Sequence, residues 1–290
     1  MPSRREILSL LPAAALQLHA AQPKMHLAIH QTTSLAAGFR PSLEGYARAG
    51  IKSVEIIAPH LDPFLKSDGL PAARRLLSNL GLTPVSHGGR PGIWEPSPEH
   101  AKAIDEMKRN AEAAAALGID RLMAPCTATG KFTPDDYKTV IAHMREAGDI
   151  AKQFNVTLMM EFTRSSTLIG TLPTVLRLTR EAAHPNVKPM LDFYHFWTGL
   201  SKFEDLDLIR PGELHHVHIQ DVPDMPRELL DSITREIPGT GVAPTARILA
   251  KLREKQYTGP LSLELFYPKY QQTDPYEMAM AFRKNAEPFL

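Results

Sequence analysis

The sequence has very little cysteine and no excess of charge of either sign. Cys126 is the only cysteine among 290 residues, so an internal disulfide and any zinc site built on several cysteines are excluded. The 33 Lys and Arg residues are balanced by 32 Asp and Glu, so the chain has no basic field with which to hold a polyanion. Histidines and carboxylates are therefore the candidate metal ligands, and no nucleic acid partner is expected.

Long apolar runs are also missing, apart from a short one near the N-terminus. An arginine pair, Arg4-Arg5, precedes the apolar run 8–18 and small residues, which is the order of a twin-arginine export signal. We therefore predict a signal at 1–23 and a single domain at 24–290, in an exported or periplasmic protein. The alternative is a frayed N-terminal helix in a cytoplasmic protein. No later run could span a membrane, so no membrane anchor is expected.

The rest of the chain alternates short apolar runs with longer segments of helical period. Short runs rich in β-branched residues and bounded by turn residues predict strands. The clearest helical segments are 98–117, 134–154, 171–182 and 244–255. Eight strands are predicted: 25–30, 53–58, 83–87, 121–125, 157–162, 187–193, 215–220 and 260–266.

Eight strands separated by helices predict an α/β fold, a (β/α)8 TIM barrel. Closing into a barrel buries both the inner strand faces and the apolar helix faces. A doubly wound open sheet is the main alternative, but it would carry a glycine-rich turn after the first strand. That turn is missing after residue 30, which favours the barrel.

Polar residues end or interrupt four consecutive strands in the second half of the chain. Active sites of such barrels collect at the carboxyl ends of the strands, and a carboxylate among apolar neighbours needs a cation or many hydrogen bonds. Three carboxylates and one imidazole suit Mn²⁺, Mg²⁺ or Co²⁺, with Zn²⁺ as the alternative. Each residue taken alone is also compatible with a structural hydrogen bond. We predict that one divalent metal ion is held by Glu161, Asp192, His218 and Glu264.

A series of short motifs between residues 157 and 277 carries a family resemblance. In order they are DFYHFW from Asp192, EDL from Glu204, VHIQD from Val217, PRE from Pro226, IPGTG from Ile237 and LELF from Leu263. This series resembles the xylose isomerase-like TIM barrel superfamily, and within it the 2-keto-myo-inositol (inosose) isomerases and related sugar epimerases. The first half of the chain agrees with this superfamily only in the spacing of its predicted strands. The resemblance implies the same four metal ligands, a substrate-side histidine at His195 and a substrate-facing arginine at Arg227.

An isomerase of this kind moves a carbonyl group between neighbouring carbons. The reaction removes a proton next to the ketone, and a chelating cation stabilises the enediolate that forms. A carboxylate beside the cation can take that proton and return it to the adjoining carbon. Glu161 and Glu264 are the candidate bases, with His195 as a relay. His87 is a further candidate for substrate binding, or a histidine that only fills a polar loop.

The charge of this site narrows the substrate. Three carboxylates and a divalent cation leave about −1, which disfavours a phosphorylated substrate unless arginines compensate. The loop that follows residue 220 offers Arg227 and Arg235, and Arg235 is interpreted as a surface residue. A neutral keto-polyol, keto-sugar or keto-glycoside is therefore the expected small-molecule partner. The aromatic residues of 193–197 either line the sugar site or belong to the core.

Several functions remain open on this scaffold. The leading hypothesis is a metal-dependent isomerase or epimerase of a keto-polyol or keto-sugar. A lyase or dehydratase would form the same enediolate and then expel a leaving group. A repair endonuclease would need more histidine ligands and a basic groove, and a non-catalytic sugar-binding protein would not need two glutamate bases. The oligomeric state is also open, with a homo-oligomer among the alternatives.

Overall fold

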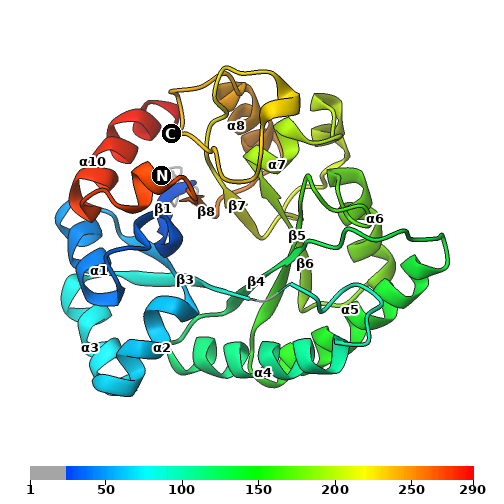
Figure 1. Cartoon of the computed structure of the whole chain (residues 1–290), viewed down its shortest axis with the longest axis horizontal. Helices are drawn as coiled ribbons and strands as arrows, with labels where there is room; N and C mark the ends of the chain where they lie inside the picture. Colours follow the sequence, from blue (N-terminus) through cyan, green and yellow to red (C-terminus); the bar gives the residue numbers. More distant parts are fainter. Residues whose placement is uncertain (1–23, 90) are drawn as a thin grey trace, which may run out of the picture.

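A computed structural model describes residues 24–89 and 91–290; the predicted export signal at 1–23 lies outside the described residues. Eight parallel strands form a closed barrel in which each strand pairs with its neighbours in the chain and β1 pairs with β8. Figure 1 shows the strands at the centre of a ring of helices. The predicted (β/α)8 TIM barrel is thus confirmed. The strands are β1 His26–His30, β2 Ser53–Ile56, β3 Thr83–Gly88, β4 Arg121–Cys126, β5 Thr157–Phe162, β6 Val187–Asp192, β7 His216–His218 and β8 Pro260–Leu263.

All eight predicted strands are present, but β2, β7 and β8 are shorter than predicted by two or three residues. The prediction extended β8 to residue 266, whereas the strand ends at Leu263. There the hydroxyl group of Thr33 replaces a strand neighbour: it donates to the Leu263 carbonyl (2.9 Å) and accepts from the Leu265 amide (3.0 Å). Glu264 consequently lies just beyond the strand, at the barrel mouth.

Helices follow the strands and surround the barrel (Figure 1). The four segments predicted as clear helices all form, each within two residues of the predicted bounds. Helix α7 begins directly after β6 with no intervening loop, so its first turn lies at the barrel mouth. The helices are α1 Phe39–Arg48, α2 Ala58–Ser67, α3 Leu70–Leu80, α4 His100–Ala116, α5 Asp136–Gln153, α6 Leu172–Ala182, α7 Phe193–Thr198, α8 Thr245–Glu254, α9 Pro268–Gln271 and α10 Pro275–Ala286, with 3-10 turns at Gln31–Ser34, Phe203–Leu208, Arg227–Leu229 and Glu287–Phe289.

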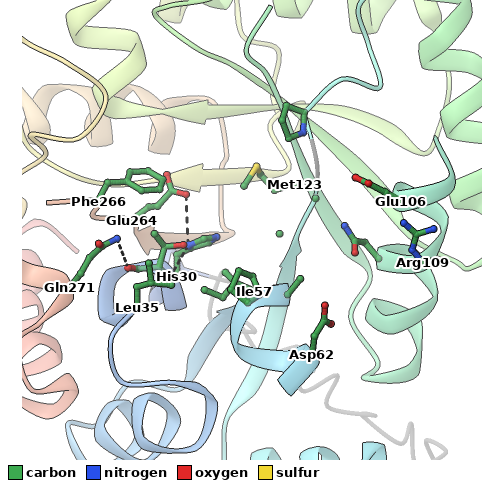
Figure 2. A pocket seen from close by; sticks show the side chains of 17 residues that line it. His30, Leu35, Ile57, Asp62, Glu106, Arg109, Met123, Glu264, Phe266 and Gln271 are labelled. Carbon is green, nitrogen blue, oxygen red and sulfur yellow. Dashed lines mark hydrogen bonds and ion pairs between the residues drawn. The ribbon is translucent and has the colours of Figure 1, made fainter. Parts of the chain in front are cut away.

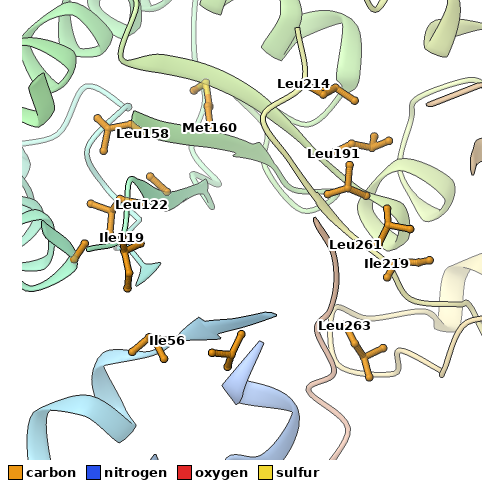
Figure 3. Close-up of a cluster of buried hydrophobic side chains, with 14 of the residues drawn as sticks. Ile56, Ile119, Leu122, Leu158, Met160, Leu191, Leu214, Ile219, Leu261 and Leu263 are labelled. Atoms are coloured by element: carbon orange, nitrogen blue, oxygen red, sulfur yellow. The ribbon is translucent and has the colours of Figure 1, made fainter. Parts of the chain in front are cut away.

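The main hydrophobic core lies between the strands and the helices. Figure 3 shows aliphatic side chains of this layer, among them Leu158 and Leu191. Successive side chains of a strand point to opposite faces. The strand residues next to Leu158 and Leu191 in the sequence therefore point into the barrel. There Met123, Met159 and Met190 form a separate buried cluster. The same alternation directs the polar residues two positions further along β5 and β6 into the barrel.

The lone cysteine and the aromatic run after β6 belong to the interior. Cys126 is free and buried. Phe193, Tyr194 and Phe196 are buried as well, which favours the core interpretation of this run. None of the helices in the described part of the chain is long and apolar enough to cross a membrane.

Candidate metal centre

The four predicted metal ligands converge inside the barrel. Glu161 lies on β5, Asp192 and His218 end β6 and β7, and Glu264 follows β8. One nitrogen or oxygen atom of each side chain lies within 4.8 Å of the corresponding atoms of the other three. All four are buried, and Asp192 and His218 have no exposed surface. The structure therefore brings together the set that the sequence selects.

The donor atoms of this cluster face a common point and fit a cation. His218 Nδ1 lies 3.3 Å from Glu161 Oε1, 3.6 Å from Asp192 Oδ2 and 3.2 Å from Glu264 Oε2. His218 Nδ1 and Glu161 Oε1 have no hydrogen-bond partner among the described residues. Leaving a buried polar atom without a partner costs about 1–3 kcal/mol, and a divalent ion would remove that cost. Three carboxylates and one imidazole are a suitable donor set.

The turn from β6 into α7 orients both Asp192 and His195. Asp192 caps α7: its Oδ1 accepts a hydrogen bond from the His195 amide (2.7 Å). The other carboxylate oxygen, Oδ2, faces the cluster and accepts from Gln220 Nε2. His195 is thereby placed beside the cluster, and its Nδ1 accepts from the Arg164 amide (3.2 Å). Burial lowers the pKa of His195 to about 4, so the ring is neutral near pH 7.

Arg235 is part of this cluster, so its interpretation as a surface residue is wrong. Its side chain is about 2% exposed, and Nη1 lies 3.1 Å from Asp192 Oδ2 and 2.5 Å from Glu264 Oε2. Nη2 lies 3.1 Å from His195 Nε2. The guanidinium carbon is 4.6 Å from the centre of the Phe266 ring, a distance at which an arginine is attracted to an aromatic face. Arg235 thus neutralises part of the carboxylate charge.

Asp221 holds the loop that carries Arg235 across the barrel mouth. Its backbone forms an antiparallel bridge with Glu236, the residue after Arg235. Its carboxylate accepts hydrogen bonds from the amides of Val222 (2.8 Å), Gly239 (2.8 Å) and Ala243 (2.9 Å). The loop therefore folds back onto the end of β7, and this keeps Arg235 directed inward.

The other two predicted substrate residues lie outside the cluster. Arg227 is exposed and donates to the Trp197 carbonyl. Two cavities lie at the barrel mouth, both lined by Glu264, and Arg227 lines neither of them. His87 is buried on β3, and its Nδ1 lies 2.6 Å from the Gly88 carbonyl oxygen. It lines neither cavity either. Arg235 and not Arg227 is the arginine that lies beside the carboxylates and lines the cavity there.

His30 is a neighbour of the cluster that the sequence analysis missed. It ends β1, is about 3% exposed, and its Nδ1 lies 3.7 Å from Glu264 Oε1. Figure 2 shows the two side chains next to each other in the wall of a cavity. The signal was present in the sequence, because His30 is a polar residue at the end of an apolar strand, like the four chosen ligands.

Two cavities border the cluster. The smaller, about 250 Å³, is lined by residues that include Glu161, His195 and Arg235. The larger, about 710 Å³, extends over the ends of β1 to β3 as far as Arg109 on α4 (Figure 2). Both cavities are lined by Glu264. A ligand at the cluster therefore has room on two sides.

The carboxylates of the cluster differ in how readily they ionise. Burial raises the pKa of Glu161 to about 7. Burial acts in the same direction on Glu264, but His218 and Arg235 outweigh it and lower its pKa to about 2. For His218, burial lowers the pKa, but Glu264 and Glu55 raise it well above its usual value. Without a cation, the cluster therefore retains protons near neutral pH, and a cation would displace them.

Relatives of known name include isomerases and dehydratases. The inosose isomerase of Halalkalibacterium halodurans is 28% identical over 176 residues, which are 60% of this chain and 62% of that relative. The inosose isomerase of Bacillus subtilis is 26% identical over 189 residues, 64% of this chain and 68% of the relative. The 3-dehydroshikimate dehydratase of Pseudomonas putida is 27% identical over 249 residues, 81% of this chain but 37% of that protein.

Solved structures share the fold across most of the chain. The IolI protein, in a crystal structure with a bound zinc atom, superposes with a TM-score of 0.85 at 23% identity and covers 91% of this chain and 98% of its own. AsbF, a probable 3-dehydroshikimate dehydratase from Bacillus anthracis, gives 0.74 at 18% identity, with 90% and 98% covered. The match to one family spans residues 43–286. The chain is therefore a member of the xylose isomerase-like TIM barrel family.

Proposed function

We propose that the protein is a divalent-metal-dependent isomerase or epimerase of a keto-polyol or keto-sugar, similar in activity to inosose isomerases. The observation that supports the proposal is the convergence of four buried donor atoms within 4.8 Å of one another, in contact with a cavity. The similarity to inosose isomerases supports the substrate class. Arg235 contacts only two of the three buried carboxylates, and burying the remaining negative charge without a partner is costly.

Glu161, Asp192, His218 and Glu264 would hold the ion. Bound there, a divalent cation would polarise a ketone and its vicinal hydroxyl and stabilise negative charge on their oxygens. The donor set suits Mn²⁺, Mg²⁺ or Co²⁺, and Zn²⁺ is the alternative.

Glu161 and Glu264 are the candidate bases, because both line the smaller cavity. One of them takes the proton from the carbon next to the ketone, and the electron pair of that C–H bond moves toward the carbonyl oxygen. In an isomerase, the same or the other glutamate then returns a proton to the adjoining carbon, and the hydroxyl proton of the first carbon passes to the former carbonyl oxygen, so that the ketone forms at the first carbon. In an epimerase, the other glutamate delivers a proton to the opposite face of the first carbon. Both residues border the space where the reacting carbons would lie.

His195 and Arg235 would bind the oxygens of the substrate. Both are buried, line the smaller cavity and lie next to each other. Arg235 also corrects the charge of the site: three carboxylates, one divalent ion and one guanidinium sum to zero. Because Arg235 already contacts two carboxylates, no free arginine is left in the cluster for a phosphate. A neutral keto-polyol remains the substrate that fits best.

The larger cavity supports a second candidate function, a lyase acting on a keto-glycoside. A six-carbon ring at the smaller cavity would leave about 710 Å³ next to Glu264 for a second unit. The base would again remove the proton next to the ketone. The bond from the neighbouring carbon to the glycosidic oxygen would then break, and the leaving group would depart with the electron pair and gain a proton. The similarity to dehydratases, which also eliminate, favours keeping this candidate.

Proton NMR of reactions in D₂O separates the two candidates. The metal-loaded protein is incubated with a panel of inososes and 3-keto-glycosides, and the Glu264→Gln variant serves as the control for uncatalysed exchange. An isomer that carries deuterium, with no released aglycone, is the expected result. Release of an aglycone or a water-loss product would favour the lyase. Absence of product and of exchange with every metal would contradict both.

A further inference from the structure

Glu55 is a buried carboxylate that contacts the back of the candidate metal ligand His218. It lies on β2, has no exposed surface and reaches across the barrel to β7. Its Oε1 is 3.0 Å from His218 Nε2 and 2.9 Å from Nε2 of His216. The strands β1 and β8 lie between β2 and β7 in the barrel, so this contact depends on side chains that cross the barrel interior.

The two nitrogens of the His218 ring therefore face different environments. Nδ1 faces Glu161, Asp192 and Glu264, while Nε2 faces Glu55. A neutral imidazole carries its proton on one nitrogen and binds a cation only through the other. A carboxylate at Nε2 keeps the proton there, so the lone pair of Nδ1 points to the cluster. It also fixes the plane of the ring.

We propose that Glu55 is a positioning residue that sets the tautomer and orientation of His218 for metal binding. The proposal rests on the metal site inferred above. Carboxylates that hold a ligating histidine raise the basicity of that ligand, and their loss typically lowers metal affinity by about 10- to 100-fold. Glu55 itself stays outside the four-residue donor set, because its contact to His218 is with the opposite nitrogen.

A second metal ion at Glu55 is the competing interpretation. Glu55, His216 and His218 also place one donor atom each within 4.8 Å of the others. However, Glu55 Oε1 and His218 Nε2 form a hydrogen bond of 3.0 Å, whereas Nε2 of His216 lies 2.9 Å from the same oxygen but has no hydrogen-bond partner among the described residues. With a proton on Nε2 of His218, that nitrogen cannot also be a metal ligand. The hydrogen bond between Glu55 and His218 therefore favours a proton over an ion at this nitrogen of His218.

Two substitutions at Glu55 separate the contribution of its acceptor from that of its charge. In Glu55→Gln the side-chain carbonyl can still accept a hydrogen bond from Nε2, whereas Glu55→Met fills similar space and offers no such acceptor. Ser262→Ala is the matched control, because Ser262 is the buried register partner of His218 on β8 and its hydroxyl has no partner among the described residues. Each purified protein is stripped of metal and titrated with Co²⁺ and Zn²⁺ by calorimetry. Thermal unfolding reports whether each variant folds.

The expected order of affinity is wild type and Ser262→Ala, then Glu55→Gln, then Glu55→Met, with a loss of about 10- to 100-fold for Glu55→Met. One ion should bind per chain in every case. Unchanged affinity in Glu55→Met would overturn the proposal. Two ions in the wild type, of which one is lost in both Glu55 variants, would show that Glu55 is itself a ligand and would also overturn it.

The histidine tautomer is a readout that a purely structural role would not change. In the zinc-loaded wild type, a histidine nitrogen–proton correlation spectrum should show a proton on Nε2 of His218 and metal coordination through Nδ1. Glu55→Gln should keep this pattern even if its affinity falls. Coordination through Nε2 in the wild type would refute the proposal. A wild type that binds no divalent ion would refute the metal site itself, which is a distinct result from metal binding that does not depend on Glu55.

Discussion

Replacing Arg235 with methionine should lower the stability of the metal-free protein and raise its affinity for a divalent metal ion. The guanidinium lies 2.5 Å from Glu264 Oε2 and 3.1 Å from Asp192 Oδ2, so it contacts two of the four atoms that would bind the ion. In Arg235→Met these two buried carboxylates lose their cation. Breaking a buried ion pair by removing one partner costs about 3–5 kcal/mol, since the remaining charge is left without compensation.

The size of the effect on metal affinity follows from a thermodynamic cycle. If a divalent ion compensates the carboxylates in the variant, the loss of stability is confined to the metal-free state. The same 3–5 kcal/mol then appears as tighter binding, an upper bound of about 10²- to 4 × 10³-fold at 1.4 kcal/mol per tenfold. The unfolding temperature of the metal-free variant should fall by on the order of 10 °C, and added metal should restore most of it.

Thermal unfolding with and without a chelator, and a zinc titration against a competing chelator, measure both effects. The measurements are made at about pH 8, above the pKa of about 7 of Glu161, so that protonation of this carboxyl group does not mask the missing charge. Arg227→Met is the matched control, because Arg227 is exposed and contacts the Trp197 carbonyl instead of the carboxylates. Weaker metal binding by Arg235→Met, or an unchanged unfolding temperature without metal, would refute this account of the cluster.

Three further outcomes are expected. Glu264→Gln should fold like the wild type but turn over substrate about 10²- to 10⁴-fold more slowly, as steady-state kinetics and circular dichroism would show; near-native activity would contradict its role as a base. Metal affinity should rise with pH through about 7, because Glu161 must lose the proton that its raised pKa retains. Calorimetry in two buffers of different ionisation enthalpy should detect the released protons, and metal uptake without proton release near pH 6.5 would contradict this. In the metal-free protein, the stability that Glu161 contributes should be complete below its usual pKa of 4.5 and be lost as the pH rises through about 7, which denaturant titrations would measure and a flat profile would contradict.

The barrel and the convergence of the four candidate ligands could be predicted because both depend on local patterns. Apolar runs of strand length alternate with helical segments, and that alternation alone favours eight crossover units. In a parallel barrel, every strand delivers its last residues to the same face. Glu161, Asp192 and His218 could therefore be placed near one another without any knowledge of side-chain geometry. The early end of β8 could not be predicted, because the side chain of Thr33 ends that strand and no local pattern encodes a contact 230 residues away in the chain.

The choice between the two arginines could not be made from local sequence. Arg227 and Arg235 lie in the same irregular loop, where no period indicates which side chain points inward. The direction of Arg235 is set by the bridge between Asp221 and Glu236 and by the amides that the Asp221 carboxylate binds. These are tertiary contacts, so a motif that includes Arg227 could suggest an arginine but not identify it.

Glu55 and His30 were missed for a different reason, since the same rule that selected the ligands applies to them. Both are polar residues within or at the end of apolar strands in the first half of the chain, where the family motifs are absent. A buried carboxylate on β2 requires a partner as much as one on β5 does, and β2 and β5 open onto the same interior. In a closed barrel, a strand far away in sequence can thus supply the residue that holds a ligand in place. A search for polar residues in all eight strands would have predicted that Glu55 lies close to the cluster; its contact with the back of His218, as opposed to the metal side, could come only from the structure.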